Sequence, residues 1–153
     1  MKKLAPVLLL ITALFISCNT QRSVNGEQGY RIVLDIQDAV IADVDTFFSA
    51  FSDSTLCVSK CYHELGQTLD LALADYKSIT PEQCDPAVKE ASLHVCLTVR
   101  DLYQDQFKQM VSLDSALNIS FNTAQQKAFD SLSNDCFIRI EQAQDQLDLI
   151  ICP

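Results

Sequence analysis

Apolar residues recur at every third or fourth position over most of the chain beyond residue 29, which is the spacing of one face of an α-helix. The first such segment extends from about Tyr30 to Phe51, and aspartates occupy its other faces. The second extends from about Thr55 to Lys77 and follows Ser52-Asp53-Ser54, which offers a helix cap. The residues expected on the buried faces are Val33, Ile36, Val40, Val44, Phe47 and Phe51, then Cys57, Cys61, Leu65, Leu69, Ala72 and Tyr76.

Two helix-start signals follow the second segment. Thr80-Pro81-Glu82-Gln83 combines a capping hydroxyl, a proline at the first helical position and a glutamine three residues after the threonine, and Asp85-Pro86 repeats the signal. We predict a short helical turn around Cys84 and a third helix from Pro86 to about Ser112. Its expected buried residues are Val88, Ala91, Val95, Val99, Leu102, Phe107 and Met110.

Residues 113–122 are expected to form a loop, after which Asn122 or Thr123 caps a fourth helix. Only one glycine, Gly66, follows Gly29, which argues against a strand-and-turn fold. Four amphipathic helices with short connections predict an all-α fold, an antiparallel up-down four-helix bundle, as a single domain over residues 30–153. The stripe of the fourth helix is Phe129, Leu132, Cys136, Ile140, Ala143, Leu147 and Ile150.

The first residues predict export. Met1-Lys2-Lys3 is a short basic start, residues 4–16 are almost entirely apolar, and residues 17–20 are small or uncharged. This order is typical of an export signal, and the apolar run is shorter than the roughly 20 residues that a membrane-spanning helix needs. We predict a signal over residues 1–18 and a flexible polar leader over residues 19–29.

The route by which the signal is removed has two alternatives. Phe15-Ile16-Ser17-Cys18 resembles the bacterial lipobox, in which the cysteine is lipidated and becomes the new N-terminus. The lipobox usually has leucine three residues before the cysteine, where this chain has Phe15. In the other alternative, ordinary signal cleavage falls near Cys18 or Thr20.

Both routes leave six cysteines in the folded domain: Cys57, Cys61, Cys84, Cys96, Cys136 and Cys152. An even number in an exported chain predicts a disulfide framework that braces the bundle. Heights along the helices favour a Cys84–Cys152 pair, because both residues fall at the end of the bundle that holds the connection between helices two and three. Cys61 with Cys136 or with Cys96 is the natural inner pair, and Cys57 is harder to pair. Alternatively, some inner cysteines are buried as small hydrophobic residues.

Asn118-Ile119-Ser120 is an N-glycosylation sequon within the predicted loop, which together with the cysteines favours a eukaryotic secreted glycoprotein over a bacterial lipoprotein. Removing residues 1–18 takes away Lys2 and Lys3 and no acidic residue, so the formal charge changes from −9 to −11. Such a surface repels nucleic acid and anionic lipid headgroups. We therefore expect no nucleic-acid partner, and a membrane contact only if Cys18 is lipidated.

The sequence carries no recognisable catalytic or metal motif. Cys57-x-x-x-Cys61 followed by Tyr62-His63 does not have the spacing of haem attachment, and it lacks the paired ligands of a zinc site. His63 and His94, the only histidines, have no nucleophile pattern beside them. We expect no catalytic, metal or cofactor site. The predicted function is that of a secreted, non-enzymatic extracellular binding protein, either a carrier of a small apolar ligand or a protein-interaction factor. The alternative is a bacterial-type cell-envelope lipoprotein anchored through Cys18.

Overall fold

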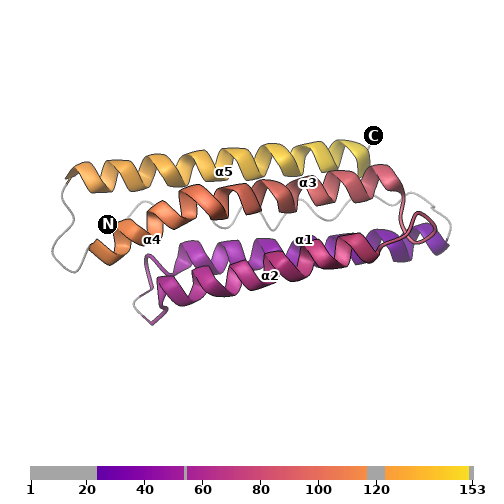
Figure 1. Ribbon diagram of the computed structural model, residues 1–153. Coiled ribbons are helices and arrows are strands. Elements are labelled where there is room, and N and C mark those ends of the chain that lie inside the picture. Colours follow the sequence, from indigo (N-terminus) through magenta and orange to yellow (C-terminus); the bar gives the residue numbers. More distant parts are fainter. Residues whose placement is uncertain (1–23, 54, 117–122, 152–153) are drawn as a thin grey trace.

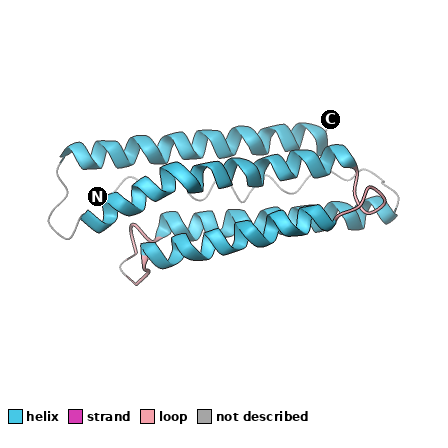
Figure 2. Ribbon diagram, in the orientation of Figure 1, coloured by secondary structure: helices cyan, strands magenta, loops and turns pink. Residues whose placement is uncertain are grey.

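The computed structural model describes residues 24–53, 55–116 and 123–151, and these residues form helices and short connections without any strand (Figure 2). The predicted all-helical class is therefore confirmed. The helices are α1 (Val24–Ser49), α2 (Val58–Ser78), α3 (Pro86–Leu102), the π-helical segment η2 (Tyr103–Phe107), α4 (Lys108–Ala116) and α5 (Thr123–Ile151).

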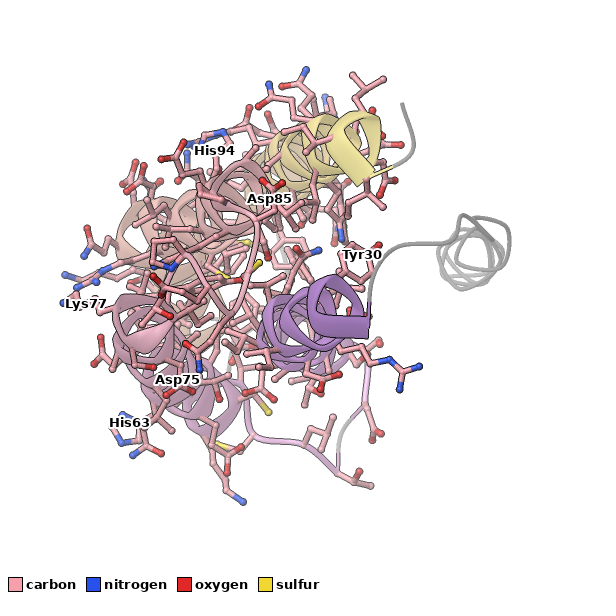
Figure 3. All side chains as sticks on the ribbon, turned by 90° about the vertical axis from the view of Figure 1, so that its right-hand side faces the viewer. Tyr30, His63, Asp75, Lys77, Asp85 and His94 are labelled. Atoms are coloured by element: carbon pink, nitrogen blue, oxygen red, sulfur yellow. The ribbon has the colours of Figure 1, made fainter. Side chains whose placement is uncertain are left out.

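The helices lie side by side along one common direction, and α3, η2 and α4 follow one another as a continuous rod (Figure 1). The connection between α1 and α2 lies at one end of the molecule. The connection between α2 and α3 lies at the other end, where the described part of α5 also finishes (Figure 1). Seen end-on, α1 and α3 lie between α2 and α5, which occupy opposite sides of the molecule (Figure 3).

The core follows the apolar stripes closely, because each helix buries the face that its sequence periodicity defines. Most predicted core positions are less than a tenth exposed. The fully or nearly fully buried large side chains are Tyr76, Phe47, Phe107, Leu65, Leu69, Leu102, Met110, Leu147, Val33, Val40, Val95 and Val99.

The start of α3 forms as its sequence predicts. The Asp85 carboxylate accepts a hydrogen bond of 2.8 Å from the backbone N–H of Ala87, and Pro86 is the first helical residue. In the preceding turn, the N–H groups of Gln83 and Cys84 donate to the carbonyl of Thr80, while the Gln83 side chain accepts from the N–H of Thr80. The predicted helical turn around Cys84 is thus confirmed.

Two helix starts differ from the prediction. Helix α1 begins at Val24, six residues before the predicted start, so residues 24–29 of the predicted leader are helical. Helix α2 begins at Val58 and not at Thr55, and its N-cap is Cys57, without a side-chain cap. The Asp53 carboxylate accepts hydrogen bonds from both the N–H and the hydroxyl of Thr55, so these residues form a tight turn outside the helix.

The third helical rod is longer than predicted, since it continues through η2 to Ala116 and includes residues expected in the loop. Two stripe positions were also wrong. Cys57 is exposed because it precedes the helix, and Ile150 is 37 % exposed. Ile151 packs against the core instead, because it lies four residues after Leu147 and therefore on the same face.

The predicted disulfide bracing is not present among the described residues, where Cys57, Cys61, Cys84, Cys96 and Cys136 are all free thiols. They lie on different elements of the fold, apart from the first two. The predicted export signal over residues 1–18, including Cys18, lies outside the described residues. So do Asn118 and Cys152.

Candidate functional site

A cluster of eight aromatic rings lies in the half of the molecule that contains the α1–α2 connection. At its centre, the buried rings of Phe47 and Phe107 are stacked with centroids 4.9 Å apart. Phe48 stacks on Phe137 of α5 at 4.6 Å, and the other contacts continue the cluster to α2. The eight residues of this aromatic cluster are Phe47, Phe48, Phe51, Tyr62, Tyr103, Phe107, Phe129 and Phe137.

An open groove of about 300 Å³ lies next to this cluster, between α2 and the junction of α3 with η2. Its shape depends on Gly66, because a Cβ atom on this residue would lie only 2.3 Å from the hydroxyl oxygen of Tyr103. A side chain at position 66 would therefore displace Tyr103. We call this the Gly66 groove; its lining residues are His63, Gly66, Gln67, Leu69, Asp70, Arg100, Tyr103 and Gln104.

Tyr62 fixes the ring that borders the Gly66 groove. Its ring stacks on that of Tyr103 with centroids 4.2 Å apart and an interplanar angle of 10°. Its hydroxyl donates a 3.1 Å hydrogen bond to the backbone carbonyl of Tyr103, the first residue of the π-helical segment. Burial raises the pKa of Tyr62 to about 12, and the hydrogen bond to Tyr103 adds to the rise, so the phenol is protonated and remains a donor at neutral pH.

The groove presents hydrogen-bonding groups and both signs of charge. Arg100 is half-buried and Asp70 is exposed, while the imidazole of His63 is 3.1 Å from the amide nitrogen of Gln67. Such an arrangement suits contact with a polar surface or a small polar ligand.

A second, fully buried polar cluster ties α1, α2 and α3 together. The Tyr76 hydroxyl is 2.6 Å from the Ser92 hydroxyl, and both oxygens are 3.3 Å from the backbone carbonyl of Val33. Ser92 also donates to the side-chain oxygen of Gln37, and the thiol of Cys96 lies 3.8 Å from the Tyr76 hydroxyl. Burial raises the pKa of Tyr76 far above its usual value, so its phenol stays neutral. The hydrogen bonds of this polar cluster hold α1, α2 and α3 together in the core.

The two histidines lie apart from each other. His63 and His94 are exposed, lie on different helices and point to different sides of the molecule (Figure 3). Over the described ranges, no three histidine, cysteine or acidic side chains come together as metal ligands. In the same ranges, no helix combines the length and the apolar character that crossing a membrane requires.

The described cysteines fall into two environments. Burial raises the pKa of Cys96 to about 11 and that of Cys136 to about 12, so both thiols are protonated and unreactive at neutral pH. Cys57 is exposed and borders a second open groove of about 480 Å³, formed with residues 50–53, 56, 58, 59 and 114.

Sequence reasoning missed the Gly66 groove and the polar cluster. Gly66 is the only glycine after Gly29, and this isolation inside a helical pattern was a usable signal of close approach. Ser92 lies four residues after Val88 and three before Val95, so it belongs to the buried stripe of α3. The role of Tyr103 had no local signal, because it depends on a partner in another helix.

No protein-family model matches this chain, and no curated protein or solved structure is significantly similar to it. A functional proposal for this chain therefore rests on its sequence and on the geometry of its described residues.

Proposed function

We propose that this chain is exported and acts as a non-enzymatic binding protein that engages an extracellular protein through its outer surface. The observation that supports this most is the packing between the described helices. The buried rings of Phe47 and Phe107 stack at the centre of the aromatic cluster, and the polar cluster of Tyr76, Ser92 and Gln37 is buried further along. A carrier of an apolar ligand needs an enclosed apolar cavity in this space.

The Gly66 groove is the proposed contact site. A glycine inside a helix costs about 1 kcal/mol relative to alanine, and here the glycine admits Tyr103 at the border of the groove. A π-helical segment begins at the same residue, and such segments are frequent at functional sites. The mixed charges of the groove suit a protein surface more than an apolar ligand.

We propose that the exported protein is secreted. Its proposed fold is an up-down bundle in which a Cys84–Cys152 disulfide links the C-terminus to the connection between α2 and α3. The second destination, the bacterial cell envelope with a lipid on Cys18, is supported by a specific observation. Apart from Cys57 and Cys61, the described cysteines lie on separate elements as free thiols, so a framework of three crosslinks, which favoured the secreted form, has less support.

Two experiments test the proposal. Protein isolated from its native source should yield no stoichiometric apolar molecule on organic extraction, and it should not bind a fluorescent dye that fatty acids displace. An extracted apolar molecule, or dye binding that fatty acids reverse, would instead identify a carrier. A photo-crosslinking residue at position 67, in the groove, should capture one discrete protein, whereas the same residue at His94 should not. Equal capture at both positions would contradict the groove as the contact site.

The destination needs a separate test. A lipid-anchored form should partition into detergent and lose this behaviour in the Cys18→Ala variant. A secreted form should stay in the aqueous phase and carry a glycan at Asn118.

A further inference from the structure

Two of the described cysteines lie at the same level of the bundle but on opposite sides. Cys61 is adjacent to Tyr62, whose ring centroid is 6.2 Å from that of Phe47. Cys136 is adjacent to Phe137, which stacks on the neighbouring Phe48. However, Cys61 belongs to α2 and Cys136 to α5, and α1 and α3 lie between these helices (Figure 3).

The space between Cys61 and Cys136 is filled. The rings of Phe47 and Phe107, both fully buried, are stacked at this level between α1 and η2. Cysteines can be bridged only when their Cα atoms are within about 7 Å, so these two cannot pair without removing the centre of the aromatic cluster.

Cys96 lies at a different level. Its sulfur is 3.8 Å from the hydroxyl of Tyr76, near the end of α2. Cys61 lies fifteen residues earlier in the same helix, which corresponds to about 22 Å at the rise of an α-helix. Because the Cys96 sulfur lies at the tip of the Tyr76 side chain, it can be little further from the Tyr76 backbone than that side chain reaches. The separation along α2 is much longer than this reach, so Cys61 and Cys96 cannot form a disulfide.

Cys57 is the cysteine that Cys61 can reach. The N–H of Cys61 donates a 3.0 Å hydrogen bond to the carbonyl of Cys57, so the two residues are one helical turn apart, about 6 Å along the axis. Cys57 is the N-cap of α2, where side chains lean over the first turn, and it makes no cap hydrogen bond. Burial raises the pKa of the Cys61 thiol, and Glu64 and Cys57 add to the rise.

We propose that Cys57 and Cys61 form a disulfide across the first turn of α2 when the chain is oxidised, and that Cys96 and Cys136 remain thiols. The oxidant is a low-molecular-weight disulfide, which reaches the exposed Cys57 through the open groove beside it. The Cys57 thiolate attacks one sulfur of the oxidant, forms a mixed disulfide and releases one thiolate. The Cys61 thiolate then attacks the Cys57 sulfur and releases the second thiolate. The two protons of the cysteines end on the two released thiols, and the oxidant takes up two electrons.

Peptide mapping tests this pairing directly, because trypsin cuts after Lys60, between the two cysteines, and places each of the six mature cysteines on a different peptide. The mature chain is equilibrated with oxidised and reduced glutathione, denatured with N-ethylmaleimide and digested. Peptides 32–60 and 61–77 should stay joined until reduction, and Cys96 and Cys136 should carry N-ethylmaleimide.

Two variants serve as matched controls. Cys57→Ser should make Cys61 available to N-ethylmaleimide, whereas Cys136→Ser should leave the joined peptides unchanged. The proposal is overturned if Cys61 is joined to the peptide of Cys96 or Cys136, if Cys57 and Cys61 are both alkylated or retain glutathione, or if Cys96 or Cys136 is blocked. The wild-type map decides the pairing even if a variant fails to fold.

Discussion

The hydroxyl oxygen of Tyr103 lies where a side chain on residue 66 would begin. A Cβ atom built on Gly66 would be 2.3 Å from this oxygen and 2.8 Å from the ring carbon that bears it. Both distances are far below van der Waals contact, so the Tyr103 side chain can lie against α2 at this point only because residue 66 is glycine.

The Gly66→Ala substitution should therefore destabilise the protein by about 1–3 kcal/mol, the usual cost of overpacking. In an unobstructed helix the same change would stabilise by about 1 kcal/mol, so the expected sign is opposite to that of helix propensity. Denaturant unfolding measures the difference. Tyr103→Phe, which removes the nearest atom, should recover part of the loss in a double-mutant cycle, and a neutral or stabilising Gly66→Ala would contradict this contact.

The buried polar cluster makes a separate prediction. Tyr76→Phe leaves the Ser92 hydroxyl with fewer partners at a site without solvent access, and should cost about 1–3 kcal/mol in the free energy of unfolding. Tyr62→Phe removes a hydrogen bond at a half-buried position and should cost less. If the two substitutions lower the free energy of unfolding by the same amount, burial does not make the hydrogen bonds of the Tyr76 cluster more important for stability than that of Tyr62.

The aromatic cluster should dominate core stability. Phe47→Ala removes a fully buried ring that contacts four others, so a loss of about 3–5 kcal/mol is expected. Leu149→Ala is the matched control, since this leucine is 73 % exposed and its truncation should change the stability by no more than about 0.5 kcal/mol. Urea unfolding of both variants checks the contrast, and a loss below about 1.5 kcal/mol for Phe47→Ala would contradict the packing described.

The pH dependence of stability follows from carboxyl groups that the fold partly shields from water. Partial desolvation raises the pKa of Asp45 above its usual 3.8, and partial desolvation and the neighbouring Asp145 do the same for Asp148. The folded protein holds these protons more firmly than the unfolded chain. The stabilisation that these two protonated carboxyl groups give the folded state is therefore complete below pH 3.8. It is lost as the pH rises through their pKa values in the folded protein. The melting temperature should rise as the pH is lowered from neutral toward 5, which also reduces the repulsion within a chain of net charge −9.

Asp45→Asn should raise the melting temperature at pH 7, and this advantage should shrink as the pH approaches 4. Asp101→Asn removes the same charge at an exposed position and controls for net charge. If the two variants have the same pH profile, burial of Asp45 is not the cause.

Periodicity predicted the helical class and most of the core, because burial of one helix face depends on residues that are close in sequence. It also placed the start of α3 at Pro86, where Asp85 and the proline act locally. It placed the start of α2 too early, because Asp53 bonds to Thr55 in a turn that competes with a helix cap. Ile150 and Ile151 differ by one position, and only packing against the other helices decides which is buried.

The candidate site was less predictable than the fold. Gly66 could be identified as unusual from sequence, but its partner Tyr103 lies 37 positions away, and no pattern connects them. The inner cysteine pairings were predicted from heights along the helices alone. The lateral order of the helices decides whether such residues can meet, and this order follows from packing of the whole molecule (Figure 3).

The most direct test of the central claim is the mass of the protein isolated from its native source, recorded under both non-denaturing and denaturing conditions. An exported surface-binding protein should begin at or just after Cys18, with a lipid or a glycan as its only addition, and should have the same mass per chain in both conditions. A chain that retains the first residues would contradict export. A mass that falls on denaturation by the weight of a small apolar molecule would contradict the proposed surface-binding function and identify a ligand carrier.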